Sequence, residues 1–227
     1  MTANAVHSKA WGNNEIKKYC YRYDIDWLIS EVNSGKTFRY ETFWHEGTGF
    51  ENNLFSQWAD TPFIVNGRLY YTAENYMMSE KAILFRDYKM YELIMASWDP
   101  DETKSLGKRV ANFDQAAWDK SFREIIFHGN LGKANGCSAF LNALLASGDA
   151  VLIEASPYDD TYGAGMEAKD LLDCDGLLKV HPKDWHKKDS NKQAQNNLGF
   201  VLMGLRDMLR DMLTGGDGYV GNKWILS

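Results

Sequence analysis

Residues 70–85 have the sequence YYTAENYMMSEKAILF, which predicts the end of a strand followed by an amphipathic helix. Thr72 suits the N-cap of that helix. With 3.6 residues per turn, Glu74, Met77 and Lys81 lie on one face, and the apolar residues around them place this face against the core. A charged side chain on a face that packs against the core costs free energy unless it pairs with an opposite charge or takes part in function. The helix alone therefore leaves two interpretations, an intrahelical ion pair at the edge of the core or a reactive site.

A β-hairpin is predicted immediately before this helix. Asn66 and Gly67 separate two apolar runs within residues 63–71, and both residues of a type I′ turn need positive φ. Two further strands are expected, one from the apolar–polar alternation of residues 37–44 and one from the apolar run 150–154. The sequence therefore contains the parts of a small sheet.

Most of the remaining chain predicts helices. Capping residues and apolar spacing indicate helices over residues 87–95, from after Ser97 to near Gly107, over 114–127, from Asn135 to Gly148 and over 198–212. Together these elements predict an α+β fold, a mainly helical single domain with a small β-sheet that includes the hairpin. We expect residues 1–35 to form an extension packed on the domain, residues 36–214 to be the domain, and residues 215–227 to be a C-terminal tail. Residues 167–194 predict an insertion, helical as far as Leu178 and irregular beyond it.

The composition is that of a folded protein with an acidic balance. Among its 227 residues, 44% are hydrophobic and 25% are charged, so one domain with a sizeable core is expected. The formal net charge of −6 argues against extended nonspecific binding to nucleic acid, although one modified nucleotide can still be held in a local pocket. Cys20, Cys137 and Cys174 are too widely spaced for a disulfide framework or a zinc site, and we expect neither a metal nor a cofactor.

The sequence also bears on the setting of the protein. Its N-terminus lacks an apolar signal core, and no run approaches the roughly 18 apolar residues of a membrane span. We therefore expect a soluble monomer that is cytoplasmic or otherwise intracellular and has no membrane partner.

The loop after the strand that ends at Glu154 is the second informative stretch. Ser-Pro-Tyr precedes Asp159, and Gly163 and Gly165 follow it. Glycines let backbone N–H groups approach an anion closely, and Asp159 can hydrogen-bond a ribose or orient a water. An Asx-turn at Asp159 is the structural alternative. The motifs of phosphate loops, dinucleotide folds, serine hydrolases and zinc proteases are missing from the sequence.

Several short pieces of the chain occur in the order typical of one family. These pieces are Phe43-Trp44, Phe55-Ser56-Gln57-Trp58, Thr72 to Met77, Lys81-Ala82, Leu106-Gly107, Trp118, Lys133, Glu154 to Asp159, Gly163 to Gly165, and Asn196 to Gly199 with Arg206. From about Phe43 to Arg210 the chain resembles the NADAR family, also called YbiA-like, and the resemblance implies a YbiA-like fold. This family usually has His where Asn75 stands, Trp where Tyr162 stands and Arg where Lys108 stands. Tyr162 keeps a stacking surface of a different size, which bears on substrate preference more than on reaction type.

The resemblance implies cleavage of an N-glycosidic bond. The expected substrate is ADP-ribose attached to a guanine base, in a nucleotide or in nucleic acid. Three alternatives remain open. They are an N-glycosidase of phosphorylated riboflavin-pathway intermediates, a module that binds ADP-ribose without cleaving it, and a conventional glycosidase that uses only Glu74 and Asp159.

The resemblance favours Lys81 as a nucleophile that forms a Schiff base at C1 of the opened sugar. Apolar surroundings would lower the pKa of such a lysine. Glu74 and Asp159 are then acid/base or ribose-orienting groups. The expected substrate contacts are Phe55, Ser56, Gln57, Asn75, Trp118, Tyr162, Gly163 and Asn196. Trp118 is equally well explained as a core residue, and Arg206 as a phosphate ligand or as part of a surface salt bridge.

Overall fold

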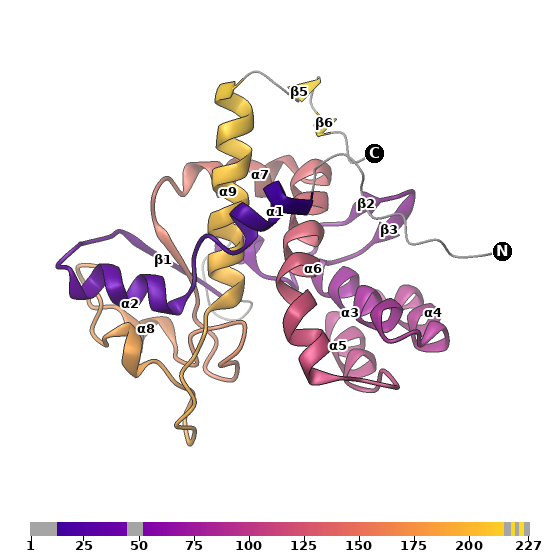
Figure 1. Cartoon of the computed structure of the whole chain (residues 1–227), viewed down its shortest axis with the longest axis horizontal. Helices are drawn as coiled ribbons and strands as arrows, with labels where there is room; N and C mark the ends of the chain where they lie inside the picture. The colour runs from indigo at the N-terminus through magenta and orange to yellow at the C-terminus, as the bar shows by residue number, and fades with distance from the viewer. Residues whose placement is uncertain (1–12, 45–51, 216–218, 221–222, 225–227) are drawn as a thin grey trace.

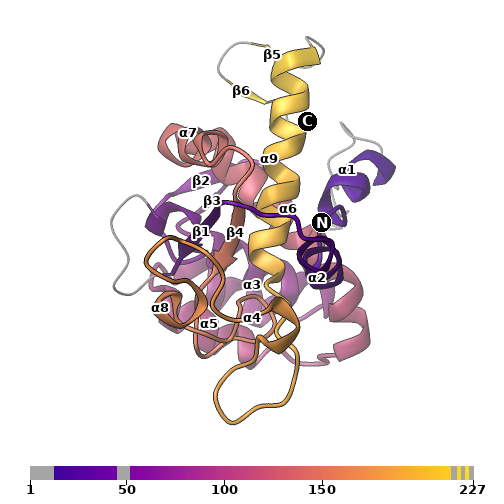
Figure 2. The same ribbon diagram turned by 90° about the vertical axis from the view of Figure 1, so that its left-hand side faces the viewer.

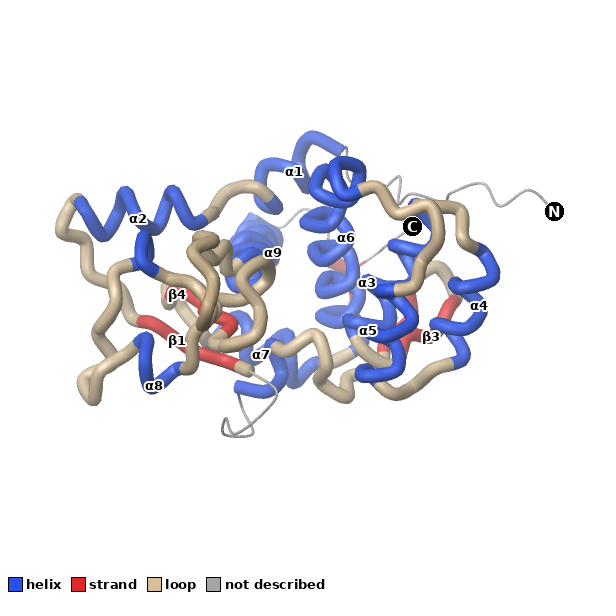
Figure 3. The backbone as a smooth tube through the Cα atoms, turned by 90° about the horizontal axis from the view of Figure 1, so that it is seen from below, coloured by secondary structure: helices blue, strands red, loops and turns tan. Residues whose placement is uncertain are grey.

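Two long helices form the centre of the molecule. The computed structural model (Figure 1) describes residues 13–44, 52–215, 219–220 and 223–224. Helices α6 (Gln115–Gly136) and α9 (Asn197–Gly215) pack against each other. Figure 3 shows the other elements on either side of this pair. One side holds α2 (Ile25–Asn33), β1 (Tyr40–Phe43), β4 (Val151–Glu154) and α8 (Ala168–Leu171). The other holds β2 (Phe63–Val65), β3 (Arg68–Tyr70), α3 (Ala73–Leu84), α4 (Tyr88–Ala96) and α5 (Pro100–Lys108).

Strands β1 and β4 pair in parallel, with Tyr40 opposite Val151 and Phe43 opposite Glu154. Strand β4 is buried and packs against α9. Gly199 permits this contact, because a Cβ atom at that position would overlap the carbonyl oxygen of Leu152. The packing fixes where β4 ends and where the following loop begins.

The hairpin of β2 and β3 forms a separate antiparallel pair. Asn66 and Gly67 have φ values of 51° and 74°, as the predicted type I′ turn requires. The hairpin lies on α6 rather than beside β1 and β4. Gly132 makes room for it, since a Cβ atom there would lie 2.5 Å from Val65 Cγ2. The mainly helical α+β fold is thus as predicted, but the hairpin does not extend the sheet of β1 and β4.

Helix α3 lies at the centre of the second side. It packs against α4, α5 and α6. Thr72 caps its N-terminus by accepting a hydrogen bond of 3.1 Å from the backbone N–H of Asn75. Asp87 and Asp99 cap α4 and α5 in the same way. Helix α3 is therefore held at its start by its own cap and along its length by three helices.

Helices α1 (Asn13–Cys20) and α2 lie on the same side of α9 in Figure 2. The hydroxyl of Tyr23, between the two helices, donates a 2.7 Å hydrogen bond to Asp207 of α9. The 3₁₀ turns η1 (Asn52–Phe55) and η2 (Pro182–Asp184), helix α7 (Ser138–Ala146), and the strand pair of β5 (Tyr219–Val220) and β6 (Lys223–Trp224) complete the described chain. Within the described ranges, no helix is both long and apolar enough to cross a membrane.

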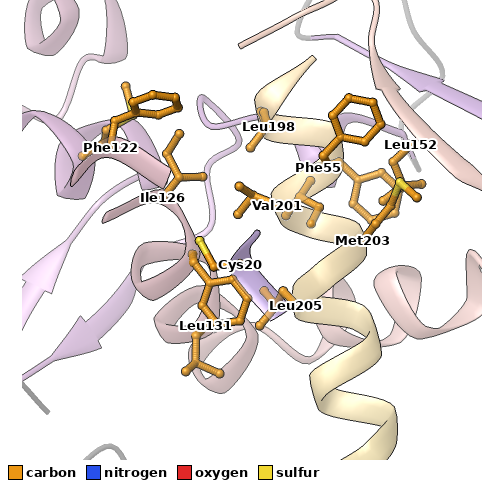
Figure 4. Packing of buried hydrophobic residues seen from close by; sticks show 14 of the residues in the cluster. Cys20, Phe55, Phe122, Ile126, Leu131, Leu152, Leu198, Val201, Met203 and Leu205 are labelled. Carbon is orange, nitrogen blue, oxygen red and sulfur yellow. The ribbon is translucent and has the colours of Figure 1, made fainter. Parts of the chain in front are cut away.

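The main core lies between α6 and α9. Figure 4 shows side chains of both helices facing each other, together with Cys20 of α1 and Phe55. The α9 residues Leu198, Val201 and Leu205 are fully buried. Each such aliphatic side chain contributes about 1.5–3 kcal/mol to stability. This core fixes the spacing between the two sides of the molecule.

Three predicted helix boundaries are wrong. The helix expected to end at Phe127 continues to Gly136, and the next helix begins at Ser138 instead of Asn135. Buried glycines of α6 face the hairpin and α3, so their packing stabilises helix where their propensity opposes it. The helix expected as far as Leu178 ends at Leu171, because Leu172 and Leu178 pair in a β-bridge.

Candidate active site

A pocket of about 160 Å³ lies where the two sides of the molecule meet. Its lining comprises Gln57, Trp58, Glu74, Met77, Met78, Lys81, Lys104, Lys108, Trp118, Ile126, Glu154, Asp159, Tyr162 and Leu198. A cavity of roughly 150 Å³ holds one benzene-sized ring. The enclosed part therefore suits one sugar or base ring, and the rest of a larger substrate must extend through the mouth.

Glu74 lies in the first turn of α3 and is only 4% exposed. Its backbone N–H donates a 2.9 Å hydrogen bond to the carbonyl oxygen of Gln57, which ties the helix start to the preceding loop. Burial raises the pKa of its carboxyl group to about 7, an effect strengthened by Asp159 and opposed by Lys104 and Lys81. Glu74 can therefore gain and lose a proton near neutral pH.

Lys81 is half-buried, about 10 Å along the helix from Glu74 by backbone rise. Its Nζ atom lies 4.3 Å from the ring centroid of Phe113 and 5.3 Å from that of Trp118. Burial lowers the pKa of the amine, and Glu74 acts in the opposite direction. Among the described residues, no ion pair within 4 Å joins Glu74 and Lys81. The interpretation of these residues as a simple intrahelical ion pair is wrong.

Asp159 stands on the opposite wall, in the loop after β4. Its Oδ1 atom accepts hydrogen bonds of 2.8 Å from Thr161 N–H and 2.7 Å from Tyr162 N–H. The Asx-turn alternative thus describes the local contacts of Asp159, and the same residue also lines the pocket. These two bonds hold the carboxylate at a fixed position in the wall.

Trp118 of α6 and Tyr162 form the aromatic part of the wall. Trp118 Nε1 donates a 3.0 Å hydrogen bond to the Tyr162 hydroxyl, and Phe122 packs edge-on against Tyr162. Burial raises the pKa of Tyr162, which keeps its hydroxyl protonated. Trp118 is 5% exposed and is therefore at once a core residue and a pocket residue.

Glu154 ends β4 and adds a third carboxyl group to the pocket lining. Its Oε2 atom is buried and has no hydrogen-bond partner. Burial, reinforced by Asp159 and Glu74, raises its pKa well above the ordinary value. Two of the three carboxyl groups of the pocket thus hold protons more tightly than a free glutamate does.

Helix α6 positions the loop that carries Gln57. Lys133 is fully buried and donates to the carbonyl oxygens of Leu54, at 2.6 Å, and Ser56, at 2.9 Å. Asn130 donates a 2.9 Å hydrogen bond to the side-chain oxygen of Gln57. These bonds place the Gln57 side chain against the pocket.

Lys104 and Lys108 occupy successive turns of α5 and contribute positive charge to the lining. Lys104 Nζ lies 5.3 Å from the ring centroid of Trp58. Lys108 is exposed. The pocket of this acidic chain therefore combines buried carboxyl groups with amines on one edge.

The structure brings six of the predicted site residues together in the pocket lining. They are Gln57, Glu74, Lys81, Trp118, Asp159 and Tyr162. The five other expected substrate contacts are Phe55, Ser56, Asn75, Gly163 and Asn196, and they lie outside the lining.

Each of these five residues instead has a structural role outside the pocket lining. Phe55 packs edge-on against Phe43 in the core, and the Ser56 hydroxyl accepts from the backbone N–H of Trp58. Asn75 donates to the carbonyl oxygens of Ile94 and Ser97 at the end of α4. Asn196 accepts from the backbone N–H of Glu154 and donates to the carbonyl oxygen of Leu152 in β4. Gly163 is needed because a Cβ atom there would lie 2.8 Å from the carbonyl oxygen of Glu154.

Arg206 matches neither of its two predicted roles. It is 2% exposed and donates to the Ser147 hydroxyl at 2.8 Å and to the Ala150 carbonyl at 2.9 Å. It is therefore a buried support of the turn before β4 rather than a phosphate ligand of the pocket or a surface ion pair.

Sequence reasoning did not assign Trp58, Lys104, Lys108 or Glu154 to the site. Glu154 and Trp58 each belong to a stretch singled out for other residues, so their positions in the sequence were a usable signal. The two lysines reach the pocket through the packing of α5 on α3, which no local pattern indicates. In the described part of the chain, no group of three His, Cys, Asp or Glu side chains could hold a metal ion.

Comparison with known proteins identifies the family. The profile of the NADAR domain matches residues 42–210. The chain belongs to the NADAR family. Within it, the chain is 34% identical over 160 residues to N-glycosidase R617 of Acanthamoeba polyphaga mimivirus, a match that covers 68% of this chain and 86% of the viral protein. It is 25% identical over 160 residues to N-glycosidase Npun_R5314 of Nostoc punctiforme, covering 70% and 87% of the two chains.

The fold of this NADAR protein also matches a solved structure. The NMR structure of the E. coli protein YbiA superposes with a TM-score of 0.57 at 21% identity, covering 82% of this chain and 92% of YbiA. The YbiA-like fold expected from the sequence is confirmed.

Proposed function

We propose that this NADAR protein is an N-glycosidase that removes ADP-ribose from ADP-ribosylated guanine through a Schiff base on Lys81. The observation that carries the proposal is the pocket itself. An amine whose pKa is lowered by burial lines the same cavity as three carboxyl groups. The chain's similarity to the viral and cyanobacterial proteins named N-glycosidase supports N-glycosidase chemistry.

Lys81 has the environment that a nucleophilic amine needs. The rings of Phe113 and Trp118 remove water from its Nζ atom without offering it a carboxylate partner. Because its pKa is lowered, a larger fraction of Lys81 is unprotonated at pH 7 than of an exposed lysine. When the sugar C1–N bond breaks, the Lys81 nitrogen can add to C1, and the opened sugar leaves an iminium ion that water hydrolyses.

Glu74 and Asp159 complete the chemistry in different ways. Glu74 titrates near pH 7, so it can take the proton that Lys81 loses and return one during hydrolysis of the iminium ion. Asp159 is held by two backbone N–H groups, which suits it to orient a ribose hydroxyl or a water.

The edge of the pocket favours an anionic substrate. Lys104 and Lys108 provide two amines on one helix face, and the diphosphate of ADP-ribose carries the complementary charge. Trp58, beside Lys104, offers an aromatic surface for a base. The pocket encloses about one ring, so the remainder of ADP-ribose would lie along this edge. The overall charge of −6 favours a single modified nucleotide or a chain end over a long nucleic acid.

The proposal is tested by incubating the protein with ADP-ribosylated guanosine and separating the products by liquid chromatography. We expect free ADP-ribose and guanosine in equal amounts, and neither in buffer alone. If the protein instead cleaves the N-glycosidic bond of a phosphorylated riboflavin-pathway intermediate, the N-glycosidase activity stands and the proposed substrate is wrong. Binding of ADP-ribose, measured by calorimetry, without product release would overturn the enzymatic proposal in favour of a binding module.

A further inference from the structure

The main chain of Glu154 is held by contacts with two other parts of the molecule and with β1. Its backbone N–H donates a 2.9 Å hydrogen bond to Oδ1 of Asn196, and its carbonyl oxygen accepts one of 2.8 Å from Ala164 N–H. It also pairs with Phe43 across the two parallel strands. These contacts fix the point on β4 from which the Glu154 side chain extends to the pocket lining.

The carboxyl group of Glu154 is short of partners inside the protein. Its Oε2 atom is buried and accepts no hydrogen bond from a described residue. The charged groups that act on it are Asp159 in the following loop, Glu74 on α3 and Lys104 on α5, while Asn196, directly before α9, contributes a neutral amide. A buried, unpaired carboxylate next to two others is costly. Glu154 therefore holds its proton more tightly than a free glutamate does, and a proton on Oε2 has no acceptor among the described residues.

The other two carboxyl groups have different tasks. Asp159 already accepts two backbone hydrogen bonds, which hold its carboxyl group in the loop. Glu74 shares the face of α3 with Lys81 and titrates near pH 7, which suits proton exchange with that amine. A group that stays protonated until it meets the leaving nitrogen is still needed, and Glu154 has that character.

We propose that Glu154 is the catalytic acid that protonates the departing nitrogen of the N-glycoside. This assignment rests on the proposed N-glycosidase function. As the C1–N bond breaks, its electron pair takes the proton of the Glu154 carboxyl group, and the base leaves neutral. Neutral Lys81 donates its lone pair to C1, and the proton that Lys81 then loses passes to Glu74. Glu74 gives this proton to the ring oxygen as the bond between C1 and that oxygen breaks, which leaves an iminium ion between Lys81 and C1. One water adds to the iminium carbon and becomes the carbonyl group of the released sugar, and its two protons restore the neutral amine of Lys81 and the acid form of Glu154.

The test compares Glu154→Gln with the matched surface substitution Glu92→Gln on α4. Rates of release from ADP-ribosylated guanosine are measured in single turnovers from pH 5 to 10. Glutamine keeps the size of the side chain but has no proton to give, so we expect a loss of about 10²–10⁴-fold at pH 7. The wild-type rate should fall at alkaline pH as Glu154 loses its proton, and this alkaline fall should be absent from Glu154→Gln and present in Glu92→Gln.

Two kinetic results would overturn the assignment. One is an unchanged rate in Glu154→Gln. The other is a reduced rate whose pH profile keeps its wild-type shape, since that outcome makes Glu154 a structural support only.

Infrared spectroscopy separates this inference from the proposed function. At pH 7, the wild type should have the C=O band of a protonated carboxyl group that is missing from Glu154→Gln. Absence of that difference would refute the acid role even if the protein cleaves the substrate. If the band is present but the wild type releases no product, the failure lies with the proposed function.

Discussion

Lys81 and Lys133 are both lysines whose pKa is lowered by burial, yet their surroundings differ in a way that separates chemistry from structure. Lys133 is fully buried in α6, and its pKa falls to about 7. Its amine donates to two carbonyl oxygens, those of Leu54 and Ser56. Lys81 is half-buried and lines the pocket, and the contacts of its amine among the described residues are with the rings of Phe113 and Trp118.

The difference teaches that a lowered pKa alone does not mark a nucleophile. A neutral amine has two N–H bonds, and the geometry at Lys133 uses both. Its nitrogen is committed to positioning the Gln57 loop and is closed to any substrate. The Lys81 nitrogen has access to the cavity. The two lysines therefore differ in whether the amine reaches the cavity and in whether its N–H bonds are already used within the protein.

The largest expected effect concerns which lysine reacts. Borohydride reduction during turnover should attach the sugar to Lys81, as located by peptide mass spectrometry. Lys81→Ala should give no adduct and lower the cleavage rate on the order of 10³-fold or more. Lys133→Met should still give the adduct at Lys81. An adduct that persists in Lys81→Ala would remove Lys81 from the nucleophile's role.

The second-largest expected effect is a pH dependence of the free energy of unfolding that is caused by Lys133. The ordinary pKa of Lys133 is 10.5 and burial lowers it to about 7 in the folded protein. Between these values the unfolded chain binds a proton that the folded chain lacks, so this lysine makes the free energy of unfolding rise with pH. The slope is about 1.4 kcal/mol per pH unit.

Chemical denaturation of wild type and Lys133→Met at pH 7 and pH 9 measures this slope. The difference in free energy of unfolding between the two proteins should grow by about 2 kcal/mol over that interval, in favour of the wild type. Exposed Lys89, replaced by Met, should show no such change and serves as the control. Parallel pH curves for wild type and Lys133→Met would mean that Lys133 remains charged in its buried position.

The difference between local and long-range interactions explains which parts of the fold the sequence predicts. The Asn66-Gly67 turn and the Thr72 cap depend on a few neighbouring residues, and both are as predicted. The continuation of α6 past Phe127 depends on glycines that face β2 and α3. Those partners lie far away in the sequence, so local propensity gave the wrong helix end.

In the site, the sequence located the reactive side chains better than the supporting ones. Glu74 and Lys81 follow from one helix face, and Asp159 from one loop. Asn75 and Asn196 were expected to contact substrate, but backbone groups of α4 and β4 use their amides. Whether an amide is free or used by a backbone cannot be deduced from residue type, because the answer depends on tertiary packing.

The smallest expected effect concerns Lys104, a third kind of lysine that acts by charge alone at the edge of the pocket. Lys104→Gln should raise KM for ADP-ribosylated guanosine about tenfold in low salt, equivalent to about 1.4 kcal/mol, and by less as added salt screens the charge. Lys104 also opposes the rise in the pKa of Glu74, so its loss should move the acidic limb of the rate profile to higher pH.

Lys89→Gln removes the same charge from α4, outside the pocket lining, and is the matched control for Lys104→Gln. Steady-state kinetics at two salt concentrations and over pH 5–8 measures both effects. A salt-independent change in KM would show that Lys104 acts through packing on Trp58. In that case the contrast would involve only two kinds of lysine, one reactive and one structural.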